Sequence, residues 1–291
     1  MSARYCIVGC GDIGRRVAKA LIARGVSPRD LLTTAKSERS LTLLRKLGLA
    51  HQQLDLDQPD VINLGCAGSH LFYTVAPPRE GKQDLRSAQL IKYFIESNEH
   101  PLKVVLISTS GVYGDRQGDW VDEQCPPQAT SPRAQRRLDS EQRWLAYGRQ
   151  HAVPVVVVRV PGIYARSRLP VKRVAQGEPV VRADECGYSN RIHADDLAEV
   201  LIAAMRFGEG GDVFNASDGA PGKMTDYLQA VAALLGYPPL PEISMHDAQY
   251  ELSEGMLSYL RESRRLKNDA MIKKLKVTLR YPDFLNGIKH G

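Results

Sequence analysis

Long apolar segments are missing from this sequence. No apolar run approaches the roughly 18 residues that a membrane-spanning helix needs, so we expect no membrane association. The five cysteines are odd in number and include no Cys-x-x-Cys pair, so we predict neither a disulfide framework nor a metal site. The chain also begins without an apolar segment followed by a small-residue cleavage site, which predicts a cytoplasmic protein without a secretory signal.

Acidic residues are scarce near the end of the chain. Residues 261–291 contain nine lysines and arginines but three acids, and this segment alone accounts for the net charge of +6. A basic surface can attract nucleic acid. However, no nucleic-acid-binding motif accompanies these residues. We therefore interpret them as a solvated face and expect no nucleic-acid partner.

The first residues carry the most specific pattern. A short apolar run at residues 3–9 predicts a buried parallel strand, and it leads directly into Gly9-x-Gly11-x-x-Gly14 and a segment with helical spacing. In this context the first glycine makes the tight turn, the second lets the backbone approach a pyrophosphate, and the third lets the helix pack on the strand. The free amides of the helix would bind the pyrophosphate. We therefore predict a dinucleotide site here.

Strand-like and helix-like segments then alternate up to residue 160. The length of 291 residues and the hydrophobic share of 43% suit one large domain or two closely packed lobes. The alternation predicts an α/β fold with a doubly wound parallel sheet and helices on both faces. We expect strands near residues 30–35, 50–55, 70–78, 103–110 and 153–160, and helices over 37–47, 84–97 and 131–150.

Beyond residue 160 this rhythm changes. Proline, glycine and charged residues interrupt the pattern, and helices are expected over residues 193–206 and 223–236. We therefore expect a smaller substrate lobe beside the sheet. The predicted division is a dinucleotide-binding core over 1–160, with 190–216 returning to it, and a substrate lobe from 161–189 and 217–291.

The second predicted strand ends without the acidic residue that would bind a ribose 2′-hydroxyl. Lys36, Ser37 and Arg39 follow it and offer two cations and a hydroxyl. Because Lys or Arg at this place accommodates a 2′-phosphate, we expect NADP as the cofactor, with NAD as the alternative. The simpler interpretation is that the two cations are merely exposed at a helix start. Asp55 is expected to accept a hydrogen bond from the adenine amine, with Asp57 as a competitor.

A more specific string begins at residue 106, where the sequence reads LISTSGVYGD. Together with the glycine pattern, it resembles the extended short-chain dehydrogenase/reductases, the NAD-dependent epimerase/dehydratase group. Further matches follow in register at residues 122–123, 159–164, 191–196 and 213–221. The resemblance covers about residues 3–285. It implies a Rossmann-type fold, an NAD(P) cofactor and a small-molecule substrate, as in nucleoside-diphosphate-sugar epimerases, dehydratases and reductases.

The resemblance and the glycine pattern together define the expected contacts. The expected cofactor contacts are Gly9, Gly11, Asp12, Ile13, Gly14, Lys36, Ser37, Arg39, Asp55, Thr74, Ala76, Ser108, Arg137 and Pro161. The expected substrate contacts are Arg133, Tyr164 and Arg168.

The sequence departs from this family at the catalytic pair. In the family a Tyr-x-x-x-Lys pair lies on the helix after the 106–115 loop, usually with a Glu four residues later. Aligning on Glu141 places Arg137 at the lysine position and Arg133 at the tyrosine position. Arginine cannot be deprotonated near neutral pH, so Arg133 cannot act as a general acid or base. Arg137 could still bind ribose or phosphate, so the resemblance implies an atypical member.

The same helix leaves two interpretations open. Its arginines, which are Arg133, Arg136, Arg137 and Arg143, could pair with Asp139 and Glu141 on a solvated face. Alternatively, one or two of them point into a pocket and bind an anionic substrate group.

Two functions follow from these observations. The first is an NAD(P)-dependent oxidoreductase, epimerase or dehydratase with a relocated acid or base, acting on a small polar metabolite. Thr109 and Tyr113 are its candidate catalytic residues, and Tyr164 and His193 lie near the expected reactive end of the cofactor. The second is a catalytically silent NADP(H)-binding sensor or assembly module. We expect the enzyme, as a monomer or a homodimer.

Overall fold

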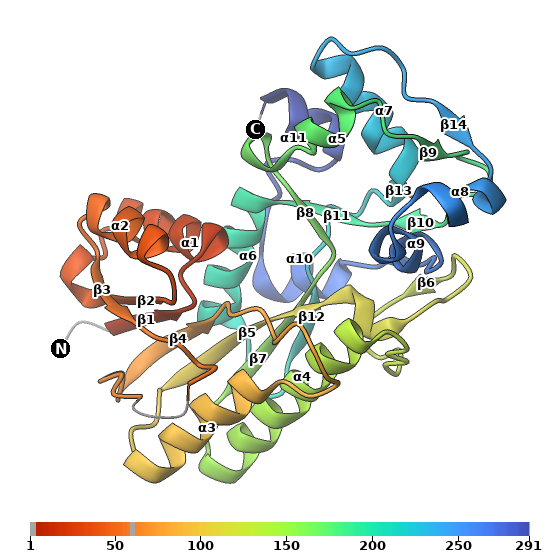
Figure 1. Ribbon diagram of the computed structural model, residues 1–291. Helices are drawn as coiled ribbons and strands as arrows, with labels where there is room; N and C mark the ends of the chain where they lie inside the picture. The colour runs from red at the N-terminus through yellow and green to blue at the C-terminus, as the bar shows by residue number, and fades with distance from the viewer. Residues whose placement is uncertain (1–3, 59–61, 291) are drawn as a thin grey trace.

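The centre of the protein is a seven-stranded parallel sheet (Figure 1). The computed structural model describes residues 4–58 and 62–290. The strands lie in the order β12-β7-β5-β4-β1-β2-β3, which confirms the predicted doubly wound fold. Chain order reverses between β1 and β4, so a crevice for ligands is expected beyond their carboxyl ends. The strands are β1 Arg4–Val8, β2 Leu31–Ala35, β3 Ala50–Gln53, β4 Ser69–Tyr73, β5 Lys103–Thr109, β7 Val155–Val160 and β12 Val213–Asn215.

Strand β7 shows why these segments form a buried sheet. It consists of four valines, an arginine and a valine, and all six residues are buried. β-branched residues suit the pleated surface, and a strand covered on both faces reads as a continuous apolar run. Edge strand β3 has no buried residue, which explains its weaker sequence signal.

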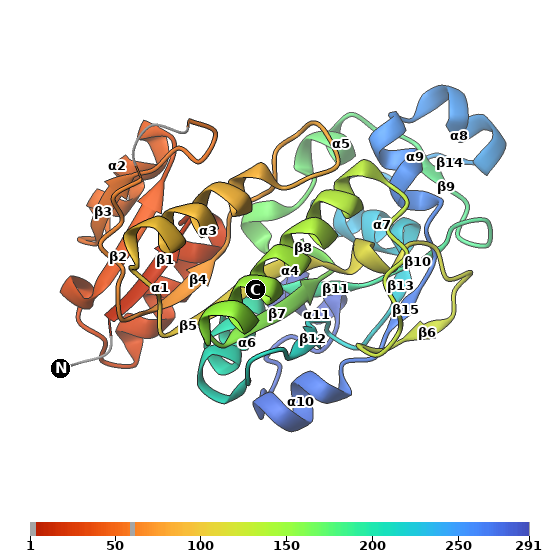
Figure 2. The same ribbon diagram turned by 90° about the horizontal axis from the view of Figure 1, so that it is seen from below.

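Helices cover both faces of the sheet. α1 (Asp12–Ala23), α2 (Glu38–Lys46) and α6 (Ala194–Phe207) pack on one face in one apolar cluster. α3 (Leu85–Ser97) and α4 (Pro132–His151) pack on the other, and Figure 2 shows them side by side. These bounds confirm the predicted helices to within about two residues. None of the described helices is long and apolar enough to cross a membrane.

A smaller group of elements stands over the carboxyl ends of the strands (Figure 1). Its apolar clusters centre on α7 and on α8 with α9. The helical elements outside the sheet layers are η1 Pro28–Asp30, η2 Ser110–Tyr113, η3 Arg166–Arg168, α5 Val171–Ala175, α7 Met224–Leu234, α8 Met245–Glu251, α9 Glu254–Leu260, α10 Asp269–Leu275 and α11 Phe284–His290. Short strand pairs are β8 Gly162–Tyr164 with β11 Arg191–His193, β9 Val180–Val181 with β14 Glu242–Ile243, β10 Tyr188–Ser189 with β13 Gly222–Lys223, and β6 Trp120–Val121 with β15 Arg265–Leu266.

The last part of the chain returns to the sheet. α10 contacts α6 and β12, and Met271 and Leu275 are fully buried in the same cluster as α1. Part of the 217–291 stretch therefore packs on the sheet layer and not within the smaller group. Several cations of this stretch form ion pairs with acids. Lys274, for example, pairs with Glu209 and Asp212 at 2.8 Å each.

Candidate functional site

The glycine turn lies at the end of β1, and two of its glycines are required by the fold. Gly9 has a φ of +81°, and a Cβ there would lie 2.7 Å from Cγ2 and 3.0 Å from the backbone nitrogen of Val75. A Cβ at Gly14 would lie 3.0 Å from Cγ2 of Ile7. The first glycine therefore permits the turn, and the third permits the close approach of α1 to β1.

The second glycine has a different role. The nearest atom to a Cβ at Gly11 would be the carbonyl oxygen of Gly9, 3.8 Å away, and φ at Gly11 is −76°. A Cβ at this position would therefore meet open space within the protein. In addition, no side chain caps α1, so its first amides remain available to an anion. The open space in front of Gly11 fits the approach of a phosphate group.

Neighbouring strands hold this turn in place. The hydroxyl of Thr74 donates to the carbonyl oxygen of Gly9 at 2.8 Å, and the amide of Cys10 donates to the carbonyl oxygen of Thr34 at 2.6 Å. Thr74, an expected cofactor contact, thus fixes the turn from behind. The side chain of Ile13, another expected contact, packs into the apolar cluster around α1.

Asp12 brings negative charge to the start of α1, and arginines neutralise it. Arg168 donates to its carboxylate at 3.0 Å, and Arg16 approaches it at 3.4 Å. Burial opposes ionisation of Asp12, but these two arginines hold the pKa of its carboxyl below the ordinary value. Arg168, which we expected to contact substrate, therefore lies at the glycine turn.

A small cavity of about 80 Å³ lies beside the glycine turn, between the ends of β1 and β2. Its lining residues are Val8, Gly9, Thr34, Lys36, Leu54, Asp55, Leu56, Val75 and Arg86. It brings together Lys36 and Asp55, two of the residues expected near the adenosine. Nζ of Lys36 lies 3.0 Å from Asp55 and 2.8 Å from Asp57, so two carboxylates already share its charge.

The other two residues expected near the ribose lie at the start of α2. The hydroxyl of Ser37 accepts a hydrogen bond from the amide of Ser40 at 3.3 Å and so caps the helix. Arg39 is exposed and has no hydrogen-bond or ion-pair partner among the described residues. Of the two cations at this strand end, Arg39 is therefore the one whose charge no described carboxylate shares.

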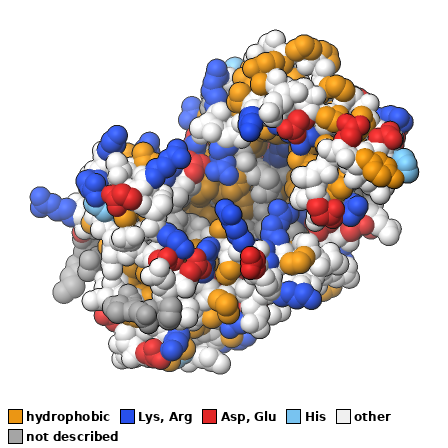
Figure 3. All heavy atoms as spheres, in the orientation of Figure 1, with side chains coloured by type: hydrophobic (Ala, Val, Ile, Leu, Met, Phe, Trp, Pro, Cys, Tyr) orange, Lys and Arg blue, Asp and Glu red, His pale blue; other side chains and the backbone are white. Residues whose placement is uncertain are grey.

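A larger cavity of about 510 Å³ lies beyond the ends of β5 and β7. Figure 3 shows the hollow between the sheet and the smaller group of elements, with Lys and Arg side chains around it. Its lining residues are Ala76, Pro77, Pro78, Arg79, Ile107, Ser108, Thr109, Ser110, Gly111, Arg133, Arg136, Arg137, Val160, Pro161, Gly162, Ile163, Tyr188, Ser189, Asn190, Tyr259, Glu262 and Arg264. Six of the expected site residues line it, namely Ala76, Ser108, Thr109, Arg133, Arg137 and Pro161.

Arg137 bridges two strand ends at the cavity wall. One of its terminal nitrogens, Nη1, donates to the carbonyl oxygens of Val75 at 2.9 Å and Ile107 at 3.1 Å. Burial lowers the pKa of Arg137 from its ordinary value, which is so high that the side chain stays charged. The guanidinium is thus a fixed cation at the carboxyl ends of β4 and β5.

Two tyrosines expected at the site lie elsewhere. Tyr113 is fully buried; its hydroxyl donates to Oδ1 of Asn215 at 2.8 Å, and burial raises its pKa. Tyr164 is 2% exposed and donates to the carbonyl oxygen of Asp283 at 3.0 Å. Neither lines the larger cavity, so both are packing residues here. His193 caps α6 by accepting from the amide of Asp195 at 3.2 Å.

A buried ion pair supports the cavity from below. Glu141 accepts from Nε of Arg159 at 3.1 Å and from Nη2 at 2.8 Å, and Ser108 donates to the same carboxylate. Arg159 also lies over the ring of Tyr113 at 4.8 Å. The glutamate used to align the helix is therefore a structural anchor between α4, β5 and β7.

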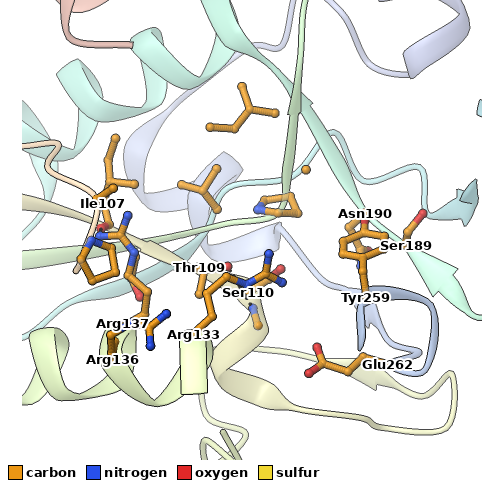
Figure 4. A pocket seen from close by; sticks show the side chains of 18 of the residues that line it. Ile107, Thr109, Ser110, Arg133, Arg136, Arg137, Ser189, Asn190, Tyr259 and Glu262 are labelled. Atoms are coloured by element: carbon orange, nitrogen blue, oxygen red, sulfur yellow. Dashed lines mark hydrogen bonds between the residues drawn. The ribbon is translucent and has the colours of Figure 1, made fainter. Parts of the chain in front are cut away.

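The sequence did not reveal the residues on the opposite wall. Tyr259 and Glu262 come from α9 and the turn after it, about 150 residues after β5 (Figure 4). A Cβ at Gly162 would lie 3.8 Å from the hydroxyl oxygen of Tyr259, so this hydroxyl faces the Pro161-Gly162 segment. No hydrogen bond involving this hydroxyl is found among the described residues. No motif marks these positions, so only the tertiary structure could identify them.

Comparison with known proteins gives a consistent family assignment. A model of the NAD dependent epimerase/dehydratase family matches residues 6–217. A trifunctional UDP-glucose 4,6-dehydratase/UDP-4-keto-6-deoxy-D-glucose 3,5-epimerase/UDP-4-keto-L-rhamnose-reductase of Arabidopsis thaliana is 23% identical over 189 residues. This match covers 59% of the chain but 28% of that curated relative, so the chain spans little more than a quarter of its length.

Solved structures agree with the sheet topology. A functionally unknown conserved protein from Silicibacter pomeroyi DSS has a TM-score of 0.83 at 27% identity, with 99% of this chain and 97% of that chain covered. The dTDP-glucose 4,6-dehydratase from Bacillus anthracis str. Ames, in complex with NAD, has a TM-score of 0.77 at 14% identity, with 99% and 94% covered. The second likeness is one of fold alone.

Proposed function

The chain belongs to the NAD-dependent epimerase/dehydratase family, and from this premise we propose that it is an NAD(P)-dependent oxidoreductase of epimerase/dehydratase type. Its substrate is a small polar metabolite that binds in the 510 Å³ cavity. We place it in the cytoplasm as a monomer or homodimer. A bound dinucleotide would accept or donate hydride, and the chain's own residues bind the cofactor, orient the substrate and move the proton.

The observation that carries this proposal is Gly11, a glycine that no close contact within the protein requires. Gly9 and Gly14 are explained by contacts within the protein, whereas a Cβ at Gly11 would meet nothing closer than 3.8 Å. The absent side chain therefore serves a ligand at the start of α1. The small cavity between β1 and β2 and the large cavity beyond β5 lie on the two sides of this turn. That order suits the adenosine and nicotinamide ends of one dinucleotide.

We further propose that NADP is preferred over NAD, with a modest ratio of affinities. Arg39 supports this preference because it is an unpaired cation at the start of α2, and β2 ends without an acid. Asp55 and Asp57 limit it, because they share the charge of Lys36 and would repel a 2′-phosphate. Among the described residues at this strand end, Arg39 is then the cation left for the extra phosphate.

Tyr259 is the proposed proton-transfer group. Arg133 and Arg137 stand where the resemblance expects tyrosine and lysine, and neither can exchange a proton near neutral pH. The hydroxyl of Tyr259 faces the Pro161-Gly162 segment across the cavity. Thr109 also lines the cavity; its hydroxyl accepts from the amide of Gly111 at 3.2 Å, which leaves its proton free to donate to a carbonyl.

The second function, a dinucleotide-binding sensor without catalysis, is favoured by the same two arginines. It shares the cofactor site with the enzyme and differs in the absence of turnover. The two are therefore separated by activity and not by binding.

Calorimetric titration with NADP(H) and NAD(H) tests the cofactor site. We expect micromolar binding by the wild-type chain and loss of binding in Gly11→Asp, with cooperative thermal unfolding retained because the Cβ meets open space there. Absence of binding to wild type would overturn the proposal. Binding without hydride exchange on a panel of carbonyl compounds and nucleotide sugars would favour the sensor.

A further inference from the structure

The larger cavity has an unusual balance of charge. Its charged lining residues are five arginines and one acid: Arg79, Arg133, Arg136, Arg137, Arg264 and Glu262. The single acid is already engaged, because its carboxylate accepts from Arg264 at 2.8 Å. Among the described residues that line the cavity, no carboxylate remains to balance the three arginines of α4.

The acids behind the cavity wall balance this charge only in part. Asp84 and Glu141 offset some of the lowering of the Arg137 pKa by burial, but neither forms an ion pair with a described arginine of α4. Glu141 is paired with Arg159, and Asp84 accepts the amides of Arg86 and Ser87 at 3.1 and 3.2 Å. Arg137 instead donates to two backbone carbonyls. The positive charge of α4 at this wall is thus unmatched by an ion pair within the described protein.

Two of these arginines also have a buried N–H group without a hydrogen-bond acceptor among the described residues. Arg136 is 7% exposed; it donates to the carbonyl oxygen of Gly81, but its buried Nε has no partner among the described residues. Arg264, on the opposite wall, is 8% exposed, and its Nε is likewise unpartnered. Buried donors without acceptors are rare in folded proteins, and a ligand is one way to satisfy them.

Arg133 differs from these two because it is exposed at the mouth of the cavity. It has no hydrogen-bond or ion-pair partner among the described residues. Figure 4 shows it beside Arg136 and Arg137 on the α4 side, with Tyr259 and Glu262 on the other. Arg133 is therefore free to contact a ligand that Arg136 and Arg137 bind deeper in the cavity.

We propose that this cavity binds a substrate that carries a carboxylate or phosphate group, which docks on Arg133, Arg136 and the free donors of Arg137. The guanidinium fork matches the oxygens of both groups. The apolar walls, which include Pro77, Ile107 and Val160, face the carbon part of the molecule. This inference rests on the proposed function, because it assigns the substrate class of the same cavity.

The arginines of α4, which stand where the family has its Tyr-x-x-x-Lys pair, would thus bind the substrate. An anionic group at Arg133 fixes one end of the substrate on the α4 wall. The reacting carbon then lies toward Pro161-Gly162 and Tyr259, where the hydroxyl faces the cavity. Binding and proton transfer would thus be divided between opposite walls.

Calorimetric titration of the full chain, saturated with NADP, tests the inference with inorganic phosphate, acetate, glucose 6-phosphate, gluconate and glucose as probes. We expect at least one of the anionic probes to bind and glucose not to bind. Phosphate with glucose 6-phosphate against acetate with gluconate separates the two anion classes. In Arg133→Gln the dissociation constant of the bound anion should rise at least tenfold, because a charge-assisted hydrogen bond is lost.

Arg143→Gln is the matched control, because Arg143 lies on the same helix but pairs with Asp139 away from the cavity. It should leave anion binding within twofold. Equal binding in wild type and Arg133→Gln, or no binding of any anionic probe, would overturn the inference. Gly11→Asp, titrated with the anion beside the wild-type chain without NADP, separates the two proposals: it should lose NADP binding and keep anion binding. If wild type binds no dinucleotide but its anion binding depends on Arg133, only the proposed cofactor function fails.

Discussion

The two halves of the crevice are built in different ways. The half beside β1 and β2 uses backbone: a glycine turn, free amides of α1 and a small cavity formed by neighbouring strands. The half beyond β5 uses side chains from several distant segments, including α4 and α9. Backbone sites tolerate changes in side chains, whereas side-chain sites change their chemistry with single substitutions. We call these the nucleotide half and the catalytic half, after the function proposed for each; the first is regular and the second irregular.

The largest expected effect is loss of the support beneath the catalytic half. Glu141→Gln leaves Arg159 buried without a counter-charge, and we expect the free energy of unfolding to fall by about 3–5 kcal/mol. Urea denaturation measures this change. Glu96→Gln breaks an exposed pair with Lys92 and should change stability by less than about 0.5 kcal/mol. If the two variants lowered the free energy of unfolding equally, the Glu141–Arg159 pair would not be a structural anchor.

The next prediction separates chemistry from cofactor binding. Tyr259→Phe should lower turnover with the identified substrate at least about 100-fold, because it removes the proposed proton-transfer group. The dissociation constant for NADP should stay within about twofold of wild type, because Tyr259 lies outside the nucleotide half. Tyr250→Phe, at a tyrosine that is 80% exposed, is the control. Turnover that survives in Tyr259→Phe would assign the proton to another group.

Substitutions at Gly9 and Gly11 should separate the effect on stability from the effect on dinucleotide binding. Gly9→Ala forces a side chain into the left-handed region and against Val75, so it should cost about 1–3 kcal/mol of stability. Gly11→Ala should change stability little, yet raise the dissociation constant for the dinucleotide about tenfold or more. Thermal unfolding with calorimetric titration measures both. A destabilised Gly11→Ala that binds normally would contradict the assignment.

The response to pH should differ between Asp57, which pairs with Lys36 in the nucleotide half, and Asp218, which lies in the loop after β12 and lines neither cavity. Arg86 hydrogen-bonds to Asp57 and holds the pKa of that carboxyl well below its usual range, so Asp57 stays ionised between pH 5 and 8. Burial, reinforced by Asp283 and Asp196, raises the pKa of Asp218 to about 7. A raised carboxyl pKa adds stability at low pH that is lost as pH rises from about 4 to about 7.

Asp218→Asn removes this loss. The stability of the variant relative to wild type should therefore grow by about 2 kcal/mol between pH 5 and pH 8, as measured by urea denaturation at both values. The exposed Asp184→Asn is the matched control and should show no such change. A difference between Asp218→Asn and wild type that is the same at both pH values would show that Asp218 does not titrate in this range.

The smallest expected effect concerns the choice between dinucleotides. Arg39→Gln should raise the dissociation constant for NADP about three- to tenfold and leave that for NAD unchanged, because a single exposed cation contacts the extra phosphate. Arg45→Gln lies on the same helix, pairs with Glu38 and should alter neither constant. Parallel losses for NADP and NAD would place Arg39 outside the 2′-phosphate site.

The sequence by itself determined the sheet and the glycine turn. The valine run of β7 and the helix pattern of α2, which ends before Gly48, depend on neighbours within a few residues, and local spacing records them. Gly9 and Gly14 lie five positions apart, so the turn at the first and the close helix packing at the second could also be predicted.

Only the tertiary structure decided which polar side chains share the cavity. Tyr113 and Tyr164 follow promising motifs but are buried beneath other elements, whereas Tyr259 and Arg264 follow none and face α4 across the cavity. The physical reason is that such contacts join residues more than 100 positions apart. Packing of whole elements sets their distance, and this packing leaves no periodic trace in the sequence.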